Sequence, residues 1–100
     1  MEVRVLEAIY EAVDEINEQL PAAQWLAKDP DMVLFGPGGR LDSLGLVNFI
    51  AEVEARLEDN FDTVITLADE KALSQKRSPF HTIGSLSEYV GSLLDARVHG

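Results

Sequence analysis

Ser43 is the residue with which this sequence could do chemistry, and Asp42 and His81 could supply the acid and the base of a serine hydrolase triad. In α/β-hydrolases the serine stands in the order Gly, any residue, Ser, any residue, Gly, on a turn that follows a strand of a parallel sheet. The residues around Ser43 do not form this pattern, and no parallel sheet is predicted. A small serine hydrolase therefore stays open only as an alternative that ranks behind the two given below.

Glycines precede Ser43 in the run GPGGR, from Gly36 to Arg40, which could suggest a phosphate-binding loop. A P-loop needs a lysine after its last glycine, and a dinucleotide-binding loop needs a strand and a crossover helix around it. Both are missing, so the run is predicted to be a turn that uses the access of glycine to positive φ. Asp29 and Asp31 could touch a cation, but the spaced ligands of an EF-hand are absent and no metal site is predicted.

The charge of the chain restricts its partners. The 100 residues hold 8 Lys and Arg against 18 Asp and Glu, and the net charge of −10 repels nucleic acid and anionic lipid but attracts basic proteins. For the basic run of Lys71, Lys76 and Arg77 three roles stay open: a solvated loop, internal salt bridges, or a contact with an anionic arm or carboxylate. The chain has no cysteine for a disulfide or a thiol nucleophile. Without a membrane-spanning window or a signal peptide, we expect a cytoplasmic, monomeric protein of one domain.

Helices are predicted on both sides of Ser43. Apolar residues recur at helical spacing from Val3 to Leu20, and Pro21 marks the end of this first helix. A long loop, residues 21–39, is expected to pack back onto the core with Trp25 as its anchor. The second helix begins at Ser43, and its core stripe is predicted to consist of Leu46, Phe49, Ile50, Val53 and Leu57.

The second half of the chain adds two further helices to an all-α fold. The stretch TVITL alternates like a strand but has no partner strand, so the segment that contains it is interpreted as an extended loop with a short helical turn. Ser78 before Pro79 predicts a short third helix around Phe80. The last helix is predicted from about Ser85, where Ser85 and Glu88 fit a capping box, and residues from about 96 are expected to form a flexible tail.

The position of Ser43 at a helix start suggests what its hydroxyl is for. Asp42 is a good N-cap, which makes Ser43 the first helical residue, with its hydroxyl at the solvent end of the helix. Free backbone N–H groups and the positive end of the helix dipole gather there, so a phosphate attached to Ser43 would be stabilised. The sequence thus offers an exposed hydroxyl suited to carrying a phosphodiester, without the neighbours that a nucleophile needs.

The stretch LDSLGLVNFI resembles the attachment motif of acyl carrier proteins, in which an Asp, Ser, Leu triplet opens the second helix. The resemblance covers nearly the whole chain, including the acidic balance, the long first loop with its LFG element and the short third helix. It implies a phosphopantetheine-binding carrier domain over residues 1–100, built as a four-helix bundle. It also implies that a phosphopantetheinyl transferase moves 4′-phosphopantetheine from coenzyme A onto Ser43, flanked by Asp42 and Leu44, and that the thiol of this arm carries an acyl group as a thioester.

The sequence departs from the carrier family after the serine. Family members usually have acidic residues two and five positions later, where this chain has Gly45 and Asn48. Acidic residues begin only at Glu52 and Glu54, which suggests a specialised pathway rather than general fatty acid biosynthesis. The segment between the second and last helices is also longer than in short fatty acid carriers, with SQKRSPFHT as the insertion.

A second stripe on the helix that starts at Ser43 is predicted to face the partners that the resemblance implies. Leu44, Val47 and Ala51 are expected to be exposed and to contact the transferase and acyl-activating, synthase or acyltransferase enzymes. Glu52 and Glu54 are expected to steer the basic surfaces of these enzymes. The carrier itself is predicted to be no enzyme. An aminoacyl or peptidyl carrier stays open, as does an acidic helical interaction module that is never modified.

Overall fold

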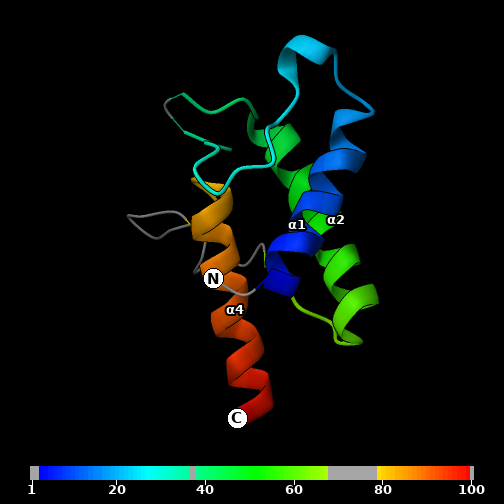
Figure 1. Cartoon of the computed structure of the whole chain (residues 1–100), viewed down its shortest axis with the longest axis vertical. Coiled ribbons are helices and arrows are strands. Elements are labelled where there is room, and N and C mark those ends of the chain that lie inside the picture. The colour runs from blue at the N-terminus through cyan, green and yellow to red at the C-terminus, as the bar shows by residue number, and fades with distance from the viewer. Residues whose placement is uncertain (1–2, 37, 68–78, 100) are drawn as a thin grey trace.

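The chain folds into helices that pack beside one another (Figure 1). The computed structural model describes residues 3–36, 38–67 and 79–99, the side chains of the last stretch as far as Asp95. The helices in this part are α1 (Val3–Asn17), the 3₁₀-helix η1 (Ala22–Gln24), α2 (Ser43–Phe61) and α4 (Ile83–His99). The described residues contain no strand, only an isolated antiparallel bridge between Val33 and Thr82. The all-α class is therefore confirmed.

Helix α1 packs against both α2 and α4, so its apolar face forms the centre of the core. Six buried residues recur at intervals of three and four along this face, as an amphipathic helix requires: Val5, Ala8, Ile9, Ala12, Val13 and Ile16. The helix ends at Asn17, four residues before the expected stop at Pro21. Beyond it the chain tightens into 3₁₀-type bonds, from Gln19 N to Ile16 O and from Leu20 N to Asn17 O.

Helix α2 begins at Ser43 as predicted, and its core stripe is confirmed. The five buried residues are Leu46, Phe49, Ile50, Val53 and Leu57. At the other end, Asp62 adopts the left-handed conformation (φ 52°) and donates its N–H to Glu58 O, which caps the helix. The Arg4 guanidinium of α1 stacks 4.6 Å above the ring of Phe61, so the start of α1 and the end of α2 are held together.

The long loop after α1 packs onto the core, as expected, but through different residues. Leu26 and Leu34 are buried, whereas Trp25, the predicted anchor, has 52% of its surface exposed. The Asn17 side chain holds Leu26, because its Oδ1 accepts from Leu26 N (2.8 Å) and its Nδ2 donates to Leu26 O (3.0 Å). These two bonds resemble the pairing of two backbone segments, and they fix the loop at Leu26 to the last residue of α1.

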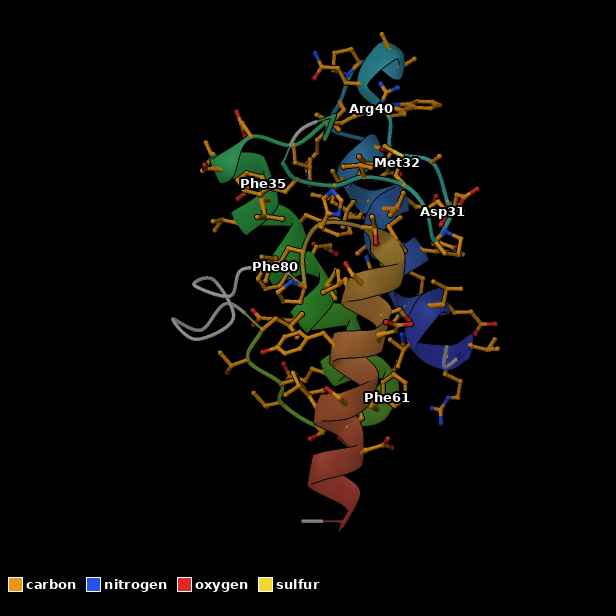
Figure 2. The ribbon with its side chains drawn as sticks, turned by 90° about the vertical axis from the view of Figure 1, so that its left-hand side faces the viewer. Asp31, Met32, Phe35, Arg40, Phe61 and Phe80 are labelled. Atoms are coloured by element: carbon orange, nitrogen blue, oxygen red, sulfur yellow. The ribbon has the colours of Figure 1, made fainter. Side chains whose placement is uncertain are left out.

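The loop also lies near the middle of α1, at Tyr10. Burial raises the pKa of the Tyr10 hydroxyl on α1, and the negative charge of the Asp29 carboxylate raises it further. Met32 and Phe35 are half-buried and pack against the core cluster. Figure 2 shows Met32 and Arg40 at the end of the molecule where α2 begins, and Phe61 at the opposite end.

Helix α4 starts earlier than the sequence suggested. Its first residue is Ile83, and the capping box is formed by Thr82 and Ser85, so the predicted pairing of Ser85 with Glu88 is wrong. Thr82 N donates to Ser85 Oγ and Ser85 N donates to Thr82 Oγ1, both at 3.0 Å. The helix then runs to His99, so the backbone is helical over residues 96–99, where a tail was expected.

The region expected to hold a short third helix is described only at its end. Pro79 and Phe80 form a turn, and the fully buried Phe80 ring meets Tyr89 edge to face, with centroids 6.3 Å apart. The rest of the expected helix, including Ser78, lies outside the described residues, as does the basic run of Lys71, Lys76 and Arg77. A four-helix bundle is therefore not confirmed.

Candidate functional site

Ser43 occupies the first position of α2, and its side chain is exposed. The preceding Asp42 is extended (ψ −177°), its backbone oxygen accepts from Leu46 N (2.8 Å), and its Oδ1 accepts from Gly45 N (2.7 Å). Asp42 is therefore the predicted N-cap. A Cβ at position 45 would lie 3.1 Å from Asp42 Oδ1, so the glycine leaves room for this tight cap.

A glycine turn delivers the chain to this helix start. Gly36 and Gly38 have φ values of +101° and +82°, which confirms the predicted use of positive φ in GPGGR. Gly39 N donates to Gly36 O (2.8 Å), and a Cβ on Gly39 would come within 2.8 Å of Phe35 Cα. After the turn, Leu41 N donates to Leu34 O (3.0 Å). The turn thus returns the chain to Leu34, one residue before the cap.

The N-terminus of α2 is open, whereas that of α4 is closed by the loop. Ile83 N donates to Met32 O (3.1 Å) and Gly84 N donates to Pro30 O (2.7 Å), so the first N–H groups of α4 are used. By contrast, Ser43 N and Leu44 N have no hydrogen-bond partner among the residues that the structure describes. Of the two helix starts, the one that carries Ser43 is available to an anion.

An exposed apolar stripe runs along α2 from the site. Leu44 and Val47 are 70% and 58% exposed, and Ala51 is exposed as well, as predicted. The stripe continues to Ala55, which the sequence interpretation missed. The helical spacing could have found it, because position 55 is four residues beyond 51 and opposite the core stripe. We call Leu44, Val47, Ala51 and Ala55 the α2 stripe.

The two acidic residues expected to steer partners are both engaged within the protein. Glu54 is half-buried, and its Oε2 accepts from the backbone N of the buried Leu67 at 2.6 Å. Glu52 lies on the side of the α2 stripe opposite to Glu54, and its carboxylate pairs with Arg56 Nε at 3.1 Å. Arg56 also reaches Glu15 of α1 at 3.4 Å, so this arginine links α2 to α1.

The other residues considered for catalysis or metal binding form hydrogen bonds that do not involve Ser43. His81 contributes its backbone oxygen, which accepts from Leu34 N at 2.7 Å, and its side chain is exposed. The structure records no hydrogen bond of the His81 ring to Ser43 or Asp42 within the described residues. Asp29 Oδ1 accepts from Asp31 N (2.8 Å), which makes DPD a local turn. In the part of the chain described, no three His, Asp or Glu side chains gather as a metal site would require.

Comparison with known proteins found no relative. A scan of family models and searches of curated proteins and solved structures gave no match. None of the described helices combines the length and the apolar character needed to cross a bilayer. A role for Ser43 therefore rests on the geometry above and on the motif in the sequence.

Proposed function

We propose that this chain is an acyl carrier protein that bears 4′-phosphopantetheine on Ser43. The observation that carries the proposal is the exposed hydroxyl of Ser43 at the open N-terminus of α2, next to the exposed Leu44 and Val47. A structural serine at a helix start would need no exposed leucine and valine beside it, because exposure of apolar side chains stabilises nothing in the isolated protein. A modifying partner that covers them explains their presence.

The residues around Ser43 fit a phosphodiester. The N–H groups of Ser43 and Leu44 point out of the helix start, where the dipole favours negative charge. Asp42 adds a negative charge, but one of its oxygens is already bound to Gly45 N, which offsets part of the repulsion. When attached, the group supplies a terminal thiol that holds an acyl chain as a thioester. The chain itself has no cysteine to do so.

The α2 stripe is the proposed contact for the transferase and for acyl-activating, synthase or acyltransferase enzymes. Because Glu52 and Glu54 are paired internally, Glu58 and Asp59, which are exposed farther along α2, are added to them as steering charges. The proposal retains a cytoplasmic monomer with the four-helix arrangement of carrier proteins.

Intact-mass measurement after incubation with coenzyme A and a broad-specificity phosphopantetheinyl transferase tests the proposal. We expect a gain of one phosphopantetheine group in the wild type and none in Ser43→Ala. Ser92→Ala is the matched control, because Ser92 is also exposed on a helix, and it should be modified like the wild type. Circular dichroism should show the same helix content in all three, since the cap Asp42 remains.

The same experiment separates the alternatives. Modification of Ser43→Ala would overturn the site, and no modification of the wild type would favour the acidic interaction module. If loading succeeds, incubation of the loaded protein with acyl-activating or with amino-acid-activating enzymes distinguishes an acyl carrier from an aminoacyl or peptidyl carrier. Turnover of a simple ester by the unmodified protein would favour the hydrolase.

A further inference from the structure

A second surface feature lies where α1 ends and the long loop begins. It is an open hollow of about 470 Å³, well away in sequence from Ser43. The side chains around it come from the last turn of α1, from the turn that follows, and from the loop: Asp14, Asn17, Glu18, Trp25, Leu26 and Lys28. None of these residues has a part in the function proposed above.

Hydrogen bonds hold two of the residues that line the hollow. Leu26 is held by its two backbone bonds to the Asn17 side chain. The Trp25 ring is held by a bond from Nε1 to Leu20 O at 2.9 Å, yet 52% of the residue is exposed. An aromatic ring whose polar edge is satisfied and whose surface faces solvent is preorganised to stack on a flat partner. Such tryptophans are typical of the residues that dominate binding energy in interfaces.

The charges around the ring favour a cation. Lys28 Nζ pairs with Asp14 Oδ2 at 2.8 Å, so these two charges offset each other. Glu18 is exposed and has no ion pair within the described residues, which leaves one negative charge over. It lies just beyond the C-terminus of α1, where the helix dipole is negative and adds to the attraction.

We propose that this hollow receives an arginine side chain of a basic partner protein. The guanidinium plane would stack on Trp25 while its N–H groups donate to the Glu18 carboxylate. Arginine fits better than lysine, because its cation is flat, less strongly hydrated and able to donate two parallel bonds. The net charge of −10 on the whole chain draws such a partner in.

The hollow and Ser43 belong to the same end of the molecule. Arg40 Nη1 donates to Ala23 O of η1 at 2.8 Å, which ties the segment before Trp25 to the turn before Ser43. Figure 1 shows η1 and the start of α2 together at this end. One partner could therefore contact the hollow and the start of α2 at once, although the proposed arginine contact does not require Ser43 to be modified.

A pair of peptides that differ only in one side-chain end group, a charged guanidinium or a neutral urea, tests the proposal on the unmodified full chain. Acetyl-Gly-Arg-Gly-amide is titrated against the protein, and the same peptide with citrulline in place of arginine is the control. Trp25 is the only tryptophan of the chain, so its fluorescence and its indole N–H signal in NMR report on this site alone. We expect saturable changes with the arginine peptide and much smaller changes with citrulline.

Four variants give distinct expectations for binding of the arginine peptide. Glu18→Gln should weaken binding of the arginine peptide about two- to fivefold, and Lys28→Gln should strengthen it about twofold, because a competing cation leaves and Asp14 is freed. Glu88→Gln, which removes an exposed acid of α4 outside the hollow, should leave it unchanged. Trp25→Leu should weaken binding of the arginine peptide as well. Because this variant lacks the tryptophan signals, its binding is measured from the backbone amide signals of residues 14–18 in NMR.

Several results would overturn the proposal. Equal binding of the citrulline peptide would show that the guanidinium is not recognised. Equal losses in Glu18→Gln and Glu88→Gln, or signal changes spread over all exposed acids, would show a general attraction to the acidic chain. Each variant is also compared with the wild type by circular dichroism, and an unfolded variant is replaced by Glu18→Asp or Trp25→Phe, for which partial binding is expected.

Discussion

The bond between Glu54 and Leu67 gives a carboxylate on α2 a structural role. Because Leu67 is fully buried, loss of the acceptor leaves its N–H without a partner away from water. Glu54→Ala should therefore lower the free energy of unfolding by about 1 to 3 kcal/mol, and Glu54→Gln, which keeps an acceptor, by less. Urea unfolding followed by circular dichroism measures both. Glu58→Ala, one turn farther along, is the control and should stay within about 0.5 kcal/mol of the wild type; a loss as large there would contradict the assigned role.

Two serines on α4 should respond in opposite ways to the same substitution. Ser85 Oγ accepts from Thr82 N and lies 2.9 Å from Pro79 O, so Ser85→Ala should lower the free energy of unfolding by about 1 kcal/mol or more. Ser87 is buried, and its hydroxyl has no partner among the described residues, so Ser87→Ala should be neutral or stabilising. Thermal unfolding of the two variants side by side checks this. If Ser87→Ala costs as much as Ser85→Ala, the hydroxyl of Ser87 has a bonding role.

At the scale of elements, the turn before α2 and the middle of α4 offer a matched pair of glycines. A Cβ on Gly39 would meet the backbone of Phe35 at 2.8 Å, whereas a Cβ on Gly91 would meet nothing within 4 Å. Gly39→Ala should therefore destabilise the protein by about 1 to 3 kcal/mol, because the turn must shift. Gly91→Ala should stabilise it by about 0.5 to 1 kcal/mol, because alanine favours the helix. Chemical unfolding of both variants tests this, and a stable Gly39→Ala protein would mean that the turn is not tightly closed.

The elements that the sequence predicted well are those whose signal is local. The buried stripe of α2, the cap at Asp42 and the glycine turn follow from helical spacing and from the preferences of single residues. The start of α4 differs because two cap patterns overlap at Ser85, and the structure uses Thr82 with Ser85, where Thr82 is also bridged to Val33 across the chain. Trp25 does not anchor the long loop as predicted. The Asn17 side chain binds the backbone of Leu26, so Leu26 is the buried residue that anchors the loop.

The candidate site was predicted in part. The exposed hydroxyl of Ser43 and the exposure of Leu44 and Val47 agree with the sequence, because residues of a stripe opposite the core must face outward. The sequence could not show that Glu54 bonds to Leu67, because the two lie on different elements and nothing in the spacing links them. Acidic residues beside a predicted interface are therefore the least secure part of such a prediction.

At the scale of the whole molecule, the excess of acids over bases should make the fold sensitive to salt. With a net charge of −10, mutual repulsion of exposed carboxylates opposes the compact state, and counterions screen it. Raising sodium chloride from about 10 mM to about 300 mM at pH 7 should therefore raise the melting temperature. The same addition at about pH 4.4, where the composition predicts a net charge near zero, is the control and should have little effect. A melting temperature that falls with salt at pH 7 would show that the internal ion pairs outweigh the repulsion.

The hydrogen bonds that join the long loop to the start of α4 also set an order of events during synthesis. Leu34, Met32 and Pro30 are held by His81, Ile83 and Gly84, so the loop before Ser43 gains these bonds only after those residues have left the ribosome. Pairing of segments so far apart also comes late in folding, because a long loop must close first. A nascent chain that already contains α1 and α2 would thus present Ser43 beside a loop that lacks its bonds to the start of α4. In the proposed function, a phosphopantetheinyl transferase that recognises the folded surface would therefore meet the complete Ser43 site only after α4 has been synthesised, so modification would follow translation.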